Sequence, residues 1–543
     1  MTRPDIDPVS HPADLATDAA RRFGMRPAYT VVMPDGTRET LSFADVDHLS
    51  DVFAGFLASP LGAKPGDVVA VQLANGLAFP IVVFGAWKAG LIVTPVNPYY
   101  TAVETWRQLL DSGARVMVAD RSAADLVRGS NNLPDFDMVI VDGAGIPVTA
   151  EHNVAPNPLS LGGAERCWAF GETLEGDAAA FRLRHPICLY QYTGGTTGSS
   201  KAAIITAANL LATRTMVGEF FGSHGSPIAN GTALTALPLY HIFAFLFGML
   251  VYVDAGTHNI VVPLARPISN LRPAFEHHAI DWMAGVDTLY AGLLAEEWFQ
   301  ASPPRLKFAI AGGAALRASV AIEWERLVGP ILEGYGLTET TGIVSCNPPT
   351  NARRIGSIGF PVTGAAVRIV DDECSDVLPG IAGELLVRGP QVAAGYLDTS
   401  IREDAFADGW FRTGDIAVID SLGVITIMDR KKDMILVSGF NVYPNEVEAV
   451  LASHPQVLEA AVVGVESERS GEAVRAYVVS RGATATPEEL DRHCRLSLAA
   501  YKVPREFVFI ESLPKSAVGK TLRAELRKAA TPRRFHLPGM QAR

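Results

Sequence analysis

Short apolar runs alternate with longer helical patterns through most of the chain. The runs at 68–73 and 91–93 are rich in Val, Ile and Leu, and the segment 78–89 between them has the apolar spacing of a helix. Similar apolar runs follow at 116–119 and 138–141. Because strands that alternate with helices usually pair in parallel, this rhythm predicts an α/β fold with a large N-terminal body of parallel and mixed sheets with helices.

The pattern changes twice towards the C-terminus. Short strand-like runs at 366–370 and 383–387, separated by turn residues, predict a β-rich subdomain. After Arg430, strand patterns alternate with helices that begin near Pro444 and Pro487, which predicts a small α+β domain. We expect an N-terminal body at 1–430, a C-terminal α+β domain at 431–530 and a flexible tail at 531–543.

Composition narrows the class of protein. The chain has 543 residues, of which 48% are hydrophobic, so it is long enough for more than one core. A formal net charge of −12 argues against nucleic acid or an anionic membrane as the main partner and favours a small ligand. The most apolar stretch, 79–96, contains Lys88 and several glycines, and we expect a buried helix and strand there and no transmembrane segment.

The five cysteines are scattered and form neither a Cys-x-x-Cys motif nor a Cys/His cluster. This spacing argues against a disulfide framework and against a zinc site. The N-terminus carries acidic residues early and lacks the apolar core of a signal peptide. We therefore expect a reduced, cytoplasmic setting, and the sequence leaves the choice between a monomer and a homodimer open.

The segment Thr193–Lys201 is rich in residues that bind anions. Its three glycines let backbone N–H groups approach an anion, its three threonines add hydroxyl donors, and Lys201 adds a positive charge. The segment does not end in Gly-Lys-Ser/Thr, which argues against a Walker A motif. The sequence therefore predicts a phosphate-binding loop that is not of the P-loop kinase type.

This loop resembles the phosphate loop of the adenylate-forming superfamily, which includes acyl- and aryl-CoA synthetases, luciferases and peptide-synthetase adenylation domains. Four further blocks follow in the order typical of that superfamily, and a C-terminal motif ends at Lys520. The blocks are Leu237–His241, Gly334–Thr340, Gly409–Asp415, and Asp429–Asp433 with Ser438–Pro444. Together they resemble most the bacterial long-chain fatty acyl-CoA synthetases.

The resemblance implies sites for ATP, Mg²⁺ and coenzyme A. It makes Tyr335 the residue beside the base, Asp415 the ribose-binding carboxylate with Arg430 as its positive partner, and Glu339 the magnesium ligand. The implied catalytic residues are Lys520, His241, Thr338 and Glu339. The implied ATP-binding residues are Thr193, Gly194, Gly195, Thr196, Thr197, Gly198, Lys201, Gly312, Gly313, Ala314, Glu333, Gly334, Tyr335, Gly336, Thr338, Asp415, Arg430 and Lys520.

Enzymes of this superfamily work in two steps, which implies a mobile C-terminal domain here. Lys520 would bridge the acyl carboxylate and the α-phosphate during adenylate formation. A rotation about a hinge at Lys432 would then remove Lys520 and bring Ser438, Gly439 and Phe440 to line the coenzyme A channel. Such a change is a hinge-type domain closure.

The acyl pocket is expected where small and apolar residues surround the implied histidine. The expected lining is His241, Phe245, Gly285, Val286, Thr288, Gly342 and Ile343. Asp287 is awkward for an aliphatic tunnel, and we expect it to cap the helix that follows rather than to meet the substrate. The small residues would admit a bulky ring as readily as a straight chain.

The resulting prediction is an ATP-dependent, AMP-forming acyl-CoA synthetase for a long-chain fatty acid or another large hydrophobic acid. One alternative is a ring-containing aryl or terpenoid acid of secondary metabolism, and another is transfer of the acyl group to a carrier protein. A non-enzymatic nucleotide-binding protein is disfavoured because Lys201, Glu339, Asp415, Arg430 and Lys520 are all present.

Overall fold

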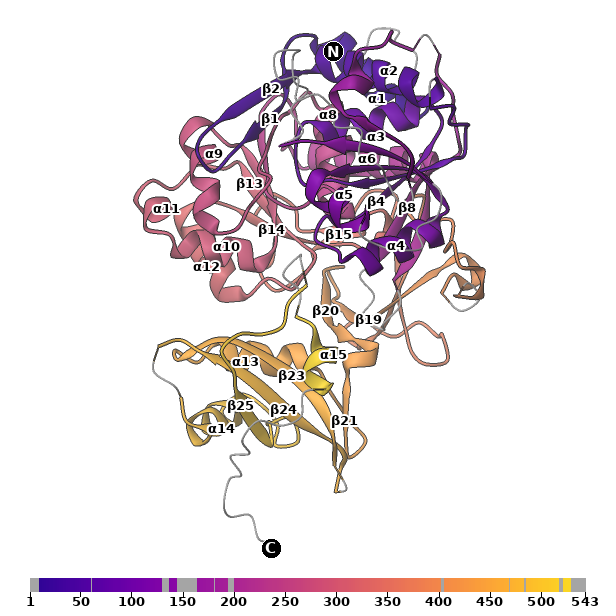
Figure 1. Ribbon diagram of the computed structural model, residues 1–543. Helices are drawn as coiled ribbons and strands as arrows, with labels where there is room; N and C mark the ends of the chain where they lie inside the picture. The colour runs from indigo at the N-terminus through magenta and orange to yellow at the C-terminus, as the bar shows by residue number, and fades with distance from the viewer. Residues whose placement is uncertain are drawn as a thin grey trace, which may run out of the picture.

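The fold is seen in a computed structural model. It describes residues 9–59, 61–128, 136–143, 164–179, 181–193, 200–401, 405–467, 469–482, 485–516 and 521–528. In these stretches the strands form two large N-terminal sheets, a four-stranded sheet and a C-terminal sheet. Figure 1 shows the C-terminal domain, in orange and yellow, below the N-terminal body.

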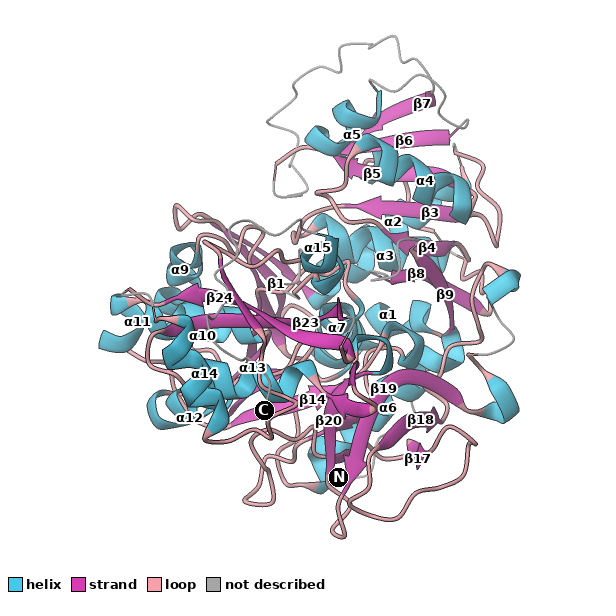
Figure 2. Ribbon diagram, turned by 90° about the horizontal axis from the view of Figure 1, so that it is seen from below, coloured by secondary structure: helices cyan, strands magenta, loops and turns pink. Residues whose placement is uncertain are grey.

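The first large sheet has seven strands among the described residues, in the order β7-β6-β5-β3-β4-β8-β9. All neighbours pair in parallel except β8 and β9, which are antiparallel. The strands are β3 Val68–Gln72, β4 Ile92–Pro95, β5 Ala114–Asp120, β6 Phe136–Val141, β7 Ala164–Ala169, β8 Ile187–Thr193 and β9 Lys201–Thr206. Figure 2 shows them side by side, as the apolar runs predict.

The second large sheet has the order β16-β15-β14-β13-β12-β10-β11-β1-β2 among the described residues. The six strands from β14 to β1 pair in parallel, and the strands outside them are antiparallel. The strands are β1 Pro27–Val32, β2 Arg38–Ser42, β10 Thr232–Thr235, β11 His258–Val261, β12 Trp282–Gly285, β13 Phe308–Ala311, β14 Ile331–Tyr335, β15 Ser345–Cys346 and β16 Phe360–Pro361.

The helices of the body lie against these two sheets. Polar caps begin several of them, because the side chains of Ser42, Thr101 and Thr206 each accept a hydrogen bond from a backbone N–H of the first helical turn. The helices are α1 Leu15–Phe23, α2 Phe43–Ala58, α3 Ala78–Lys88, α4 Ala102–Ser112, α5 Arg121–Arg128, α6 Ala207–Ser223, α7 Ile242–Phe245, α8 Tyr252–Asp254, α9 Arg272–His277, α10 Asp287–Ala295, α11 Glu297–Ala301 and α12 Ala318–Leu327.

Helix α3 is buried on all sides, as its apolar composition predicts. It belongs to the main hydrophobic core, which includes residues of both large sheets. Its one charged side chain, Lys88, is fully buried, and its Nζ lies 2.6 Å from carboxylate oxygens of both Asp47 and Asp51. The apolar stretch 79–96 is therefore a buried helix and strand, as predicted, and no described helix is long and apolar enough to cross a membrane.

Two smaller sheets complete the fold. The first is antiparallel, with the order β17-β18-β19-β20. Its strands are β17 Ala366–Val370, β18 Gly383–Arg388, β19 Phe411–Ile419 and β20 Ile425–Arg430. The C-terminal sheet has the order β22-β21-β24-β23, with β25 beside β24, and a hydrophobic core of its own. Its elements are β21 Ile435–Val437, β22 Phe440–Val442, α13 Pro444–Ala452, β23 Val457–Ser467, β24 Gly471–Ser480, α14 Pro487–Arg495, β25 Glu506–Phe509 and α15 Arg523–Lys528.

The predicted fold class is confirmed: a large α/β body with a β-rich subdomain precedes a smaller α+β domain. One element was not predicted, since β9 lies between the phosphate loop and α6, where the sequence indicated only a loop running into a helix. All five cysteines are free. The expected tail at 531–543 lies outside the described residues.

Candidate active site

Four neighbouring parallel strands of the second sheet end where the expected acyl and nucleotide residues lie. His241 follows β10, Gly285 ends β12, Gly312 follows β13, and Tyr335 ends β14. Carboxyl ends of parallel strands meet at one edge of a sheet, which is where α/β proteins bind ligands. A Cβ on Gly312 would lie 3.3 Å from the Phe243 ring, so α7 packs directly on this edge.

Two glycines let the chain fold back tightly after β14. A Cβ on Gly336 would lie 2.2 Å from the carbonyl oxygen of Gly342, so a side chain there would force the backbone to shift. Gly342 has a φ of +91°, and a Cβ there would lie 3.4 Å from the carbonyl oxygen of Ile242 in α7. The fold-back therefore places the expected pocket residues Gly342 and Ile343 next to the helix that follows His241.

Tyr335, Asp415 and Arg430 form one hydrogen-bonded group. The Tyr335 hydroxyl donates to Asp415 Oδ2, and Arg430 Nε lies 2.7 Å from Asp415 Oδ1. Asp415 lies inside β19, not at its end, and its register partner across the sheet is Arg430. Burial raises the pKa of Tyr335 well above its usual value, and the charge of Asp415 adds to that rise, so the phenol remains a donor. The structure thus joins the residues expected beside the base and the ribose.

Glu339 and Lys201 meet through a residue that the sequence did not predict, Tyr396. The Tyr396 hydroxyl donates to Glu339 Oε1 over 2.6 Å, and Lys201 Nζ lies 5.4 Å from the centre of the Tyr396 ring. Burial, with the charge of Glu339, raises the pKa of Tyr396. Backbone bonds between β9 and the segment 394–397 hold this arrangement, since Ala203 pairs with Tyr396.

The donor set fits a magnesium ion that arrives with nucleotide phosphates. Glu339 offers a single carboxylate, in the short 3₁₀ helix Thr338–Thr340, and the described residues contain no cluster of three or more metal-binding side chains. Magnesium characteristically binds through one or two carboxylates together with substrate phosphates and water. Thr338 lies next to Glu339 and is half-buried.

The two ends of the expected phosphate loop, Thr193 and Lys201, are adjacent. Thr193 is the last residue of β8 and pairs with Lys201, the first residue of β9, and Ser200 Oγ donates to the Thr193 carbonyl over 2.7 Å. The loop residues Gly194, Gly195, Thr196, Thr197 and Gly198 lie outside the described residues, and so does Lys520. The loop thus begins and ends at a paired strand end of the first sheet.

Comparison with known proteins agrees with this geometry. The family model "AMP-binding enzyme" matches residues 16–397, and the model of its C-terminal domain matches residues 446–520. The chain belongs to the AMP-binding enzyme family. A long-chain-fatty-acid–CoA ligase of Yersinia pestis is 39% identical over 96% of this chain and 95% of its own length.

Two solved structures extend the likeness of this AMP-binding enzyme to the whole fold. An anthranilate CoA ligase in complex with anthranoyl-AMP superposes with a TM-score of 0.84 at 26% identity, over 96% of this chain and 98% of its own. The o-succinylbenzoate CoA synthetase of Bacillus subtilis, in complex with ATP and magnesium, superposes with a TM-score of 0.78 at 26% identity, over 95% of this chain and 99% of its own.

In this AMP-binding enzyme His241 begins the helix that covers the strand ends. Its Nδ1 accepts a hydrogen bond from the Phe243 N–H over 3.4 Å, which makes it the N-cap of α7. Phe245, which the sequence assigned to the acyl pocket, is fully buried and packs against Phe79 and Trp87 of α3. The ring of Phe243, two residues earlier, faces Gly312 at the strand ends.

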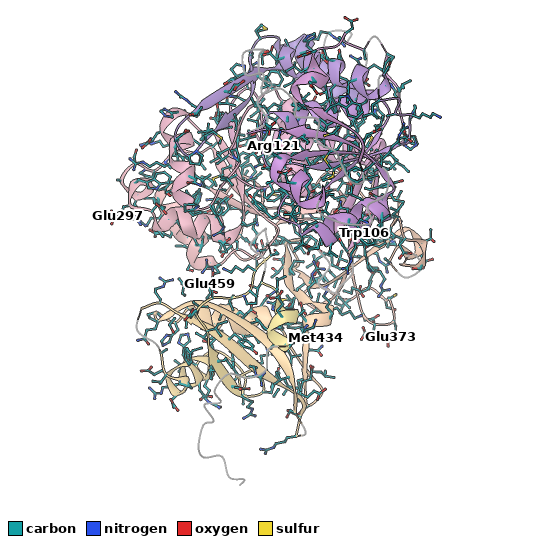
Figure 3. The ribbon with its side chains drawn as sticks, in the orientation of Figure 1. Trp106, Arg121, Glu297, Glu373, Met434 and Glu459 are labelled. Atoms are coloured by element: carbon teal, nitrogen blue, oxygen red, sulfur yellow. The ribbon has the colours of Figure 1, made fainter. Side chains whose placement is uncertain are left out.

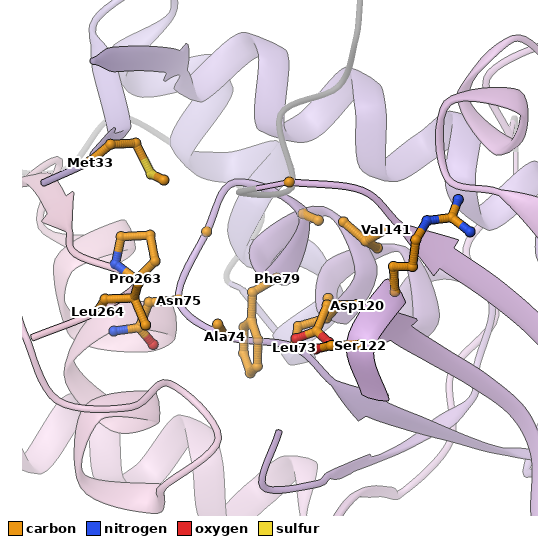
Figure 4. Close-up of a pocket in the computed structure, with 14 residues that line it drawn as sticks. Met33, Leu73, Ala74, Asn75, Phe79, Asp120, Ser122, Val141, Pro263 and Leu264 are labelled. Atoms are coloured by element: carbon orange, nitrogen blue, oxygen red, sulfur yellow. The ribbon is translucent and has the colours of Figure 1, made fainter. Parts of the chain in front are cut away.

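Asn75, which the sequence also did not reveal, holds the block that leads to His241. Its Nδ2 donates to the Leu237 carbonyl over 2.9 Å and its Oδ1 accepts from the Leu239 N–H over 2.7 Å. Asn75 also borders a cavity of about 340 Å³ between the two large sheets, together with Leu73 and Pro263 (Figure 4). Among the expected site residues that the structure describes, none lines this cavity.

The expected role of Asp287 is wrong. The N-cap of α10 is Val286, and the Asp287 side chain makes no capping bond. Asp287 instead accepts two hydrogen bonds from Arg317, from its backbone N–H over 3.0 Å and from its Nε over 2.8 Å. The Asp287 carboxylate binds the Arg317 guanidinium instead of the N-terminus of α10, because without this counter-charge it would be buried as an unpaired charge. Thr288 follows in α10 and is half-buried.

Glu333 is a buried acidic residue of β14, next to the strand ends where the expected nucleotide-binding residues lie. Its Oε1 accepts from the Leu316 N–H over 3.0 Å, just after the expected nucleotide segment Gly312–Ala314. Burial raises the pKa of Glu333 to about 7, against the effect of the Leu316 hydrogen bond. The carboxyl group therefore joins β14 to the loop after β13.

The short 3₁₀ helix Lys431–Asp433 connects the body to the C-terminal domain. Lys432 is exposed at its centre. On one side Lys431 Nζ lies 2.8 Å from Asp372, and on the other Arg527 Nη2 lies 2.7 Å from Asp433 Oδ1. The neighbours of Lys432 are thus anchored while Lys432 itself is accessible to solvent.

A second ionic group joins the two sides of this connection. Arg523 of α15 lies 2.8 Å from Glu448 Oε2 and 3.7 Å from Asp429 Oδ1, while the Asn445 N–H donates to Asp429 Oδ2 over 2.8 Å. Burial raises the pKa of Asp429 to about 6, although Arg523 acts in the opposite direction. The carboxylate at the end of the body is therefore held by the C-terminal domain.

The expected coenzyme A residues are not at the strand edge. Ser438 and Gly439 form the turn between β21 and β22, both with positive φ, and Phe440 begins β22. All three are exposed, and the Phe440 ring stacks on Tyr501 with centroids 4.9 Å apart. In Figure 1 β21 lies in the part of the C-terminal domain that is far from the body.

Proposed function

We propose that this AMP-binding enzyme is an AMP-forming acyl-CoA synthetase. The observation that carries the proposal is that the Tyr335 hydroxyl, at the carboxyl end of β14, orients the Asp415 carboxylate, while the Tyr396 hydroxyl orients the Glu339 carboxylate. The first pair suits a nucleoside and the second a metal-bound phosphate. The fatty-acid ligase of Yersinia pestis, which matches nearly the full length, supports the same reaction class.

In the first step a carboxylate oxygen of the acid attacks the α-phosphorus of ATP. The bond between that phosphorus and the bridging oxygen breaks, and pyrophosphate leaves with its electrons. Lys201 and Lys520 supply positive charge to phosphate oxygens, and the main contribution of the protein is positioning and charge stabilisation. Magnesium, held by Glu339, would neutralise charge on the phosphates.

In the second step the sulfur of coenzyme A attacks the acyl carbon. The bond from that carbon to the AMP oxygen breaks, AMP leaves, and the thiol proton passes to solvent. Ser438, Gly439 and Phe440 are exposed, and β21, which precedes them, lies in the part of the C-terminal domain far from the body (Figure 1), so a rotation of this domain about Lys432 is part of the proposal.

We propose a long-chain fatty acid or another large hydrophobic acid as the substrate. The fatty-acid ligase relative supports this choice. The Asp287 carboxylate is occupied by Arg317, so this acidic residue does not oppose an apolar acyl chain. The second candidate is a ring-containing acid, favoured by the glycines at the strand ends and by the likeness to the anthranilate and o-succinylbenzoate enzymes.

The proposal also covers the location of the protein, its acyl acceptor and its oligomeric state. We propose a cytoplasmic location, in line with five free cysteines. Coenzyme A is the proposed acceptor, with a carrier-protein thiol as the alternative, and either a monomer or a homodimer is compatible with the proposed reaction.

The test is to measure pyrophosphate and AMP release with fatty, aryl and polycyclic acids, with and without coenzyme A. The proposal predicts acid-dependent pyrophosphate release in a single turnover without coenzyme A, and continuous AMP release with it. AMP release that requires a carrier protein would instead support the carrier-protein alternative. Absence of acid-dependent pyrophosphate release with every acid would contradict the proposal.

A further inference from the structure

Arg317 connects the wall of the expected acyl pocket to the loop after β13. It is the N-cap residue of α12 and directly follows the segment that contains Gly312 and Gly313. Its backbone N–H and its Nε both donate to Asp287, which follows Gly285 and Val286. The side chain of Arg317 is therefore held in one orientation by the body of the enzyme.

The same guanidinium reaches the C-terminal domain. Arg317 Nη1 donates to the carbonyl oxygen of Leu458 in β23 over 3.1 Å. The next residue, Glu459, raises the pKa of Asp287 as a minor contributor behind burial, which is consistent with its closeness. Figure 3 shows Glu459 on the side of the C-terminal domain that faces the body.

Glu459 extends this connection within the C-terminal domain. Lys515 Nζ lies 2.5 Å from Glu459 Oε1. The backbone of Lys515 pairs with Thr521 in an antiparallel bridge. Lys515 and Thr521 are the two residues that flank the segment containing Lys520 in the sequence, so the contacts run from Asp287 to both sides of that segment.

We propose that Arg317 is a positioning residue for adenylate formation, because its hydrogen bond to Leu458 holds the C-terminal domain in the arrangement that this first step requires. This inference rests on the proposed function. Asp287 and Arg317 belong to the body, whereas Leu458 belongs to the domain that rotates, so the bond is broken when the domain turns. Arg317 therefore favours the first step over the second.

The direct test compares Arg317→Lys with the wild type in each half-reaction. Lysine keeps a positive charge beside Asp287 but lacks the second donor that reaches Leu458. A lost hydrogen bond from a charged donor corresponds to roughly tenfold in rate. We expect adenylate formation to fall about tenfold, and thioester formation from supplied acyl-adenylate to stay within about twofold.

The matched control is Arg326→Lys. Arg326 lies in the same helix, is exposed, and pairs only with Glu323 among the contacts described for it. The control should leave both rates unchanged. If the ratio of the two half-reaction rates is the same in Arg317→Lys as in the wild type, Arg317 acts only on stability and the proposal fails.

A distance measurement tests the role of Arg317 independently of whether the protein has the proposed activity. Probes on cysteines at Ile322 and Leu496, which are 58% and 81% exposed, would report the position of the C-terminal domain relative to α12 without any substrate. Cys374, the exposed native cysteine, would be replaced by serine. In the Arg317→Lys variant we expect fewer molecules to show the probe-to-probe distance that predominates in the wild-type protein. An unchanged distance distribution would overturn the proposal even in a protein with no activity.

Discussion

At the scale of single residues, the site depends on tyrosine hydroxyls that orient carboxylates. Tyr335 donates to Asp415, and Tyr396 donates to Glu339. Burial raises the pKa of both phenols, so each remains a donor throughout the ordinary pH range. A hydrogen bond to an ionised group is stronger than one between neutral groups, so each tyrosine fixes its carboxylate before a ligand binds.

Tyr335→Phe tests this role on the nucleotide side. The change removes one donor to Asp415 and keeps the aromatic ring. A hydrogen bond to a charged group contributes about 1.5–3 kcal/mol, so we expect KM for ATP to rise about tenfold or more, with a smaller effect on kcat. Steady-state kinetics would measure this. In Tyr477→Phe, which removes a buried hydroxyl bonded to Leu526 in the C-terminal domain, KM for ATP should not change.

Glu333 gives the protein a predictable pH dependence. Burial raises its pKa from an ordinary value of 4.5 to about 7, so the folded protein retains a proton that the unfolded chain has lost. The stability contributed by this group is fully present below pH 4.5 and is lost as the pH rises through about 7. Urea unfolding between pH 5 and 8 should show a smaller loss of stability in Glu333→Gln than in the wild type.

The exposed Glu297, labelled in Figure 3, provides the control for that experiment. Glu297→Gln should keep the pH dependence of the wild type. A Glu333→Gln variant with the same slope as the wild type would show that this carboxyl group is ionised in the folded protein.

At the scale of elements, the close packing after β14 shapes the site. Gly336 lies against the backbone of Gly342, and a Cβ at Gly336 would come within 2.2 Å of it. Forcing a side chain into a well-packed position typically costs about 1–3 kcal/mol. A side chain at position 336 would therefore force the backbone between Tyr335 and Ile343 to shift.

Gly336→Ala should lower the free energy of unfolding by about 1–3 kcal/mol and displace Glu339, which strongly reduces adenylate formation. Gly218→Ala is the matched control, because it lies within α6 and a Cβ there meets no atom within 4 Å. Alanine is the better helix former, so the control should be neutral or slightly stabilising. The free energy of unfolding in denaturant and the rate of pyrophosphate release would be measured for both variants. A Gly336→Ala protein with full activity would contradict the proposed role of this close contact.

The sequence predicted most elements because their patterns are local. The strand at 366–370 and the helices from Pro444 and Pro487 are confirmed, since alternation and proline position fix them. Tyr396 could not be predicted, because it lies outside every motif and reaches Glu339 only through pairing with β9. The partner of Asp287 is thirty positions away, so local capping rules gave the wrong role.

At the scale of the whole molecule, the proposed two-step reaction requires a C-terminal domain that changes position. The connection at Lys431–Asp433 has anchored neighbours on both sides, and Lys432 is exposed between them. Strand β21, which leads into the expected coenzyme A residues, lies in the part of the domain far from the body (Figure 1), whereas Glu459 lies on the side that faces the body (Figure 3). The proposed two-step reaction therefore requires a second arrangement of this domain.

Lys432→Pro should restrict this rotation. Proline fixes φ and removes a backbone donor, so it stiffens the connection without altering the strand edge. We expect adenylate formation to continue at near the wild-type rate and thioester formation to fall by an order of magnitude or more. Single-turnover measurement of both steps would test this, and a normal overall rate would exclude Lys432 as the hinge.

The most direct test of the central claim is to measure both half-reactions in Lys520→Ala. If one chain forms an adenylate with Lys520 in place and then turns to form the thioester without it, the variant should lose adenylate formation. It should still convert a supplied acyl-adenylate and coenzyme A into acyl-CoA at close to the wild-type rate. An equal loss of both half-reactions would contradict the two-step, domain-rotation account.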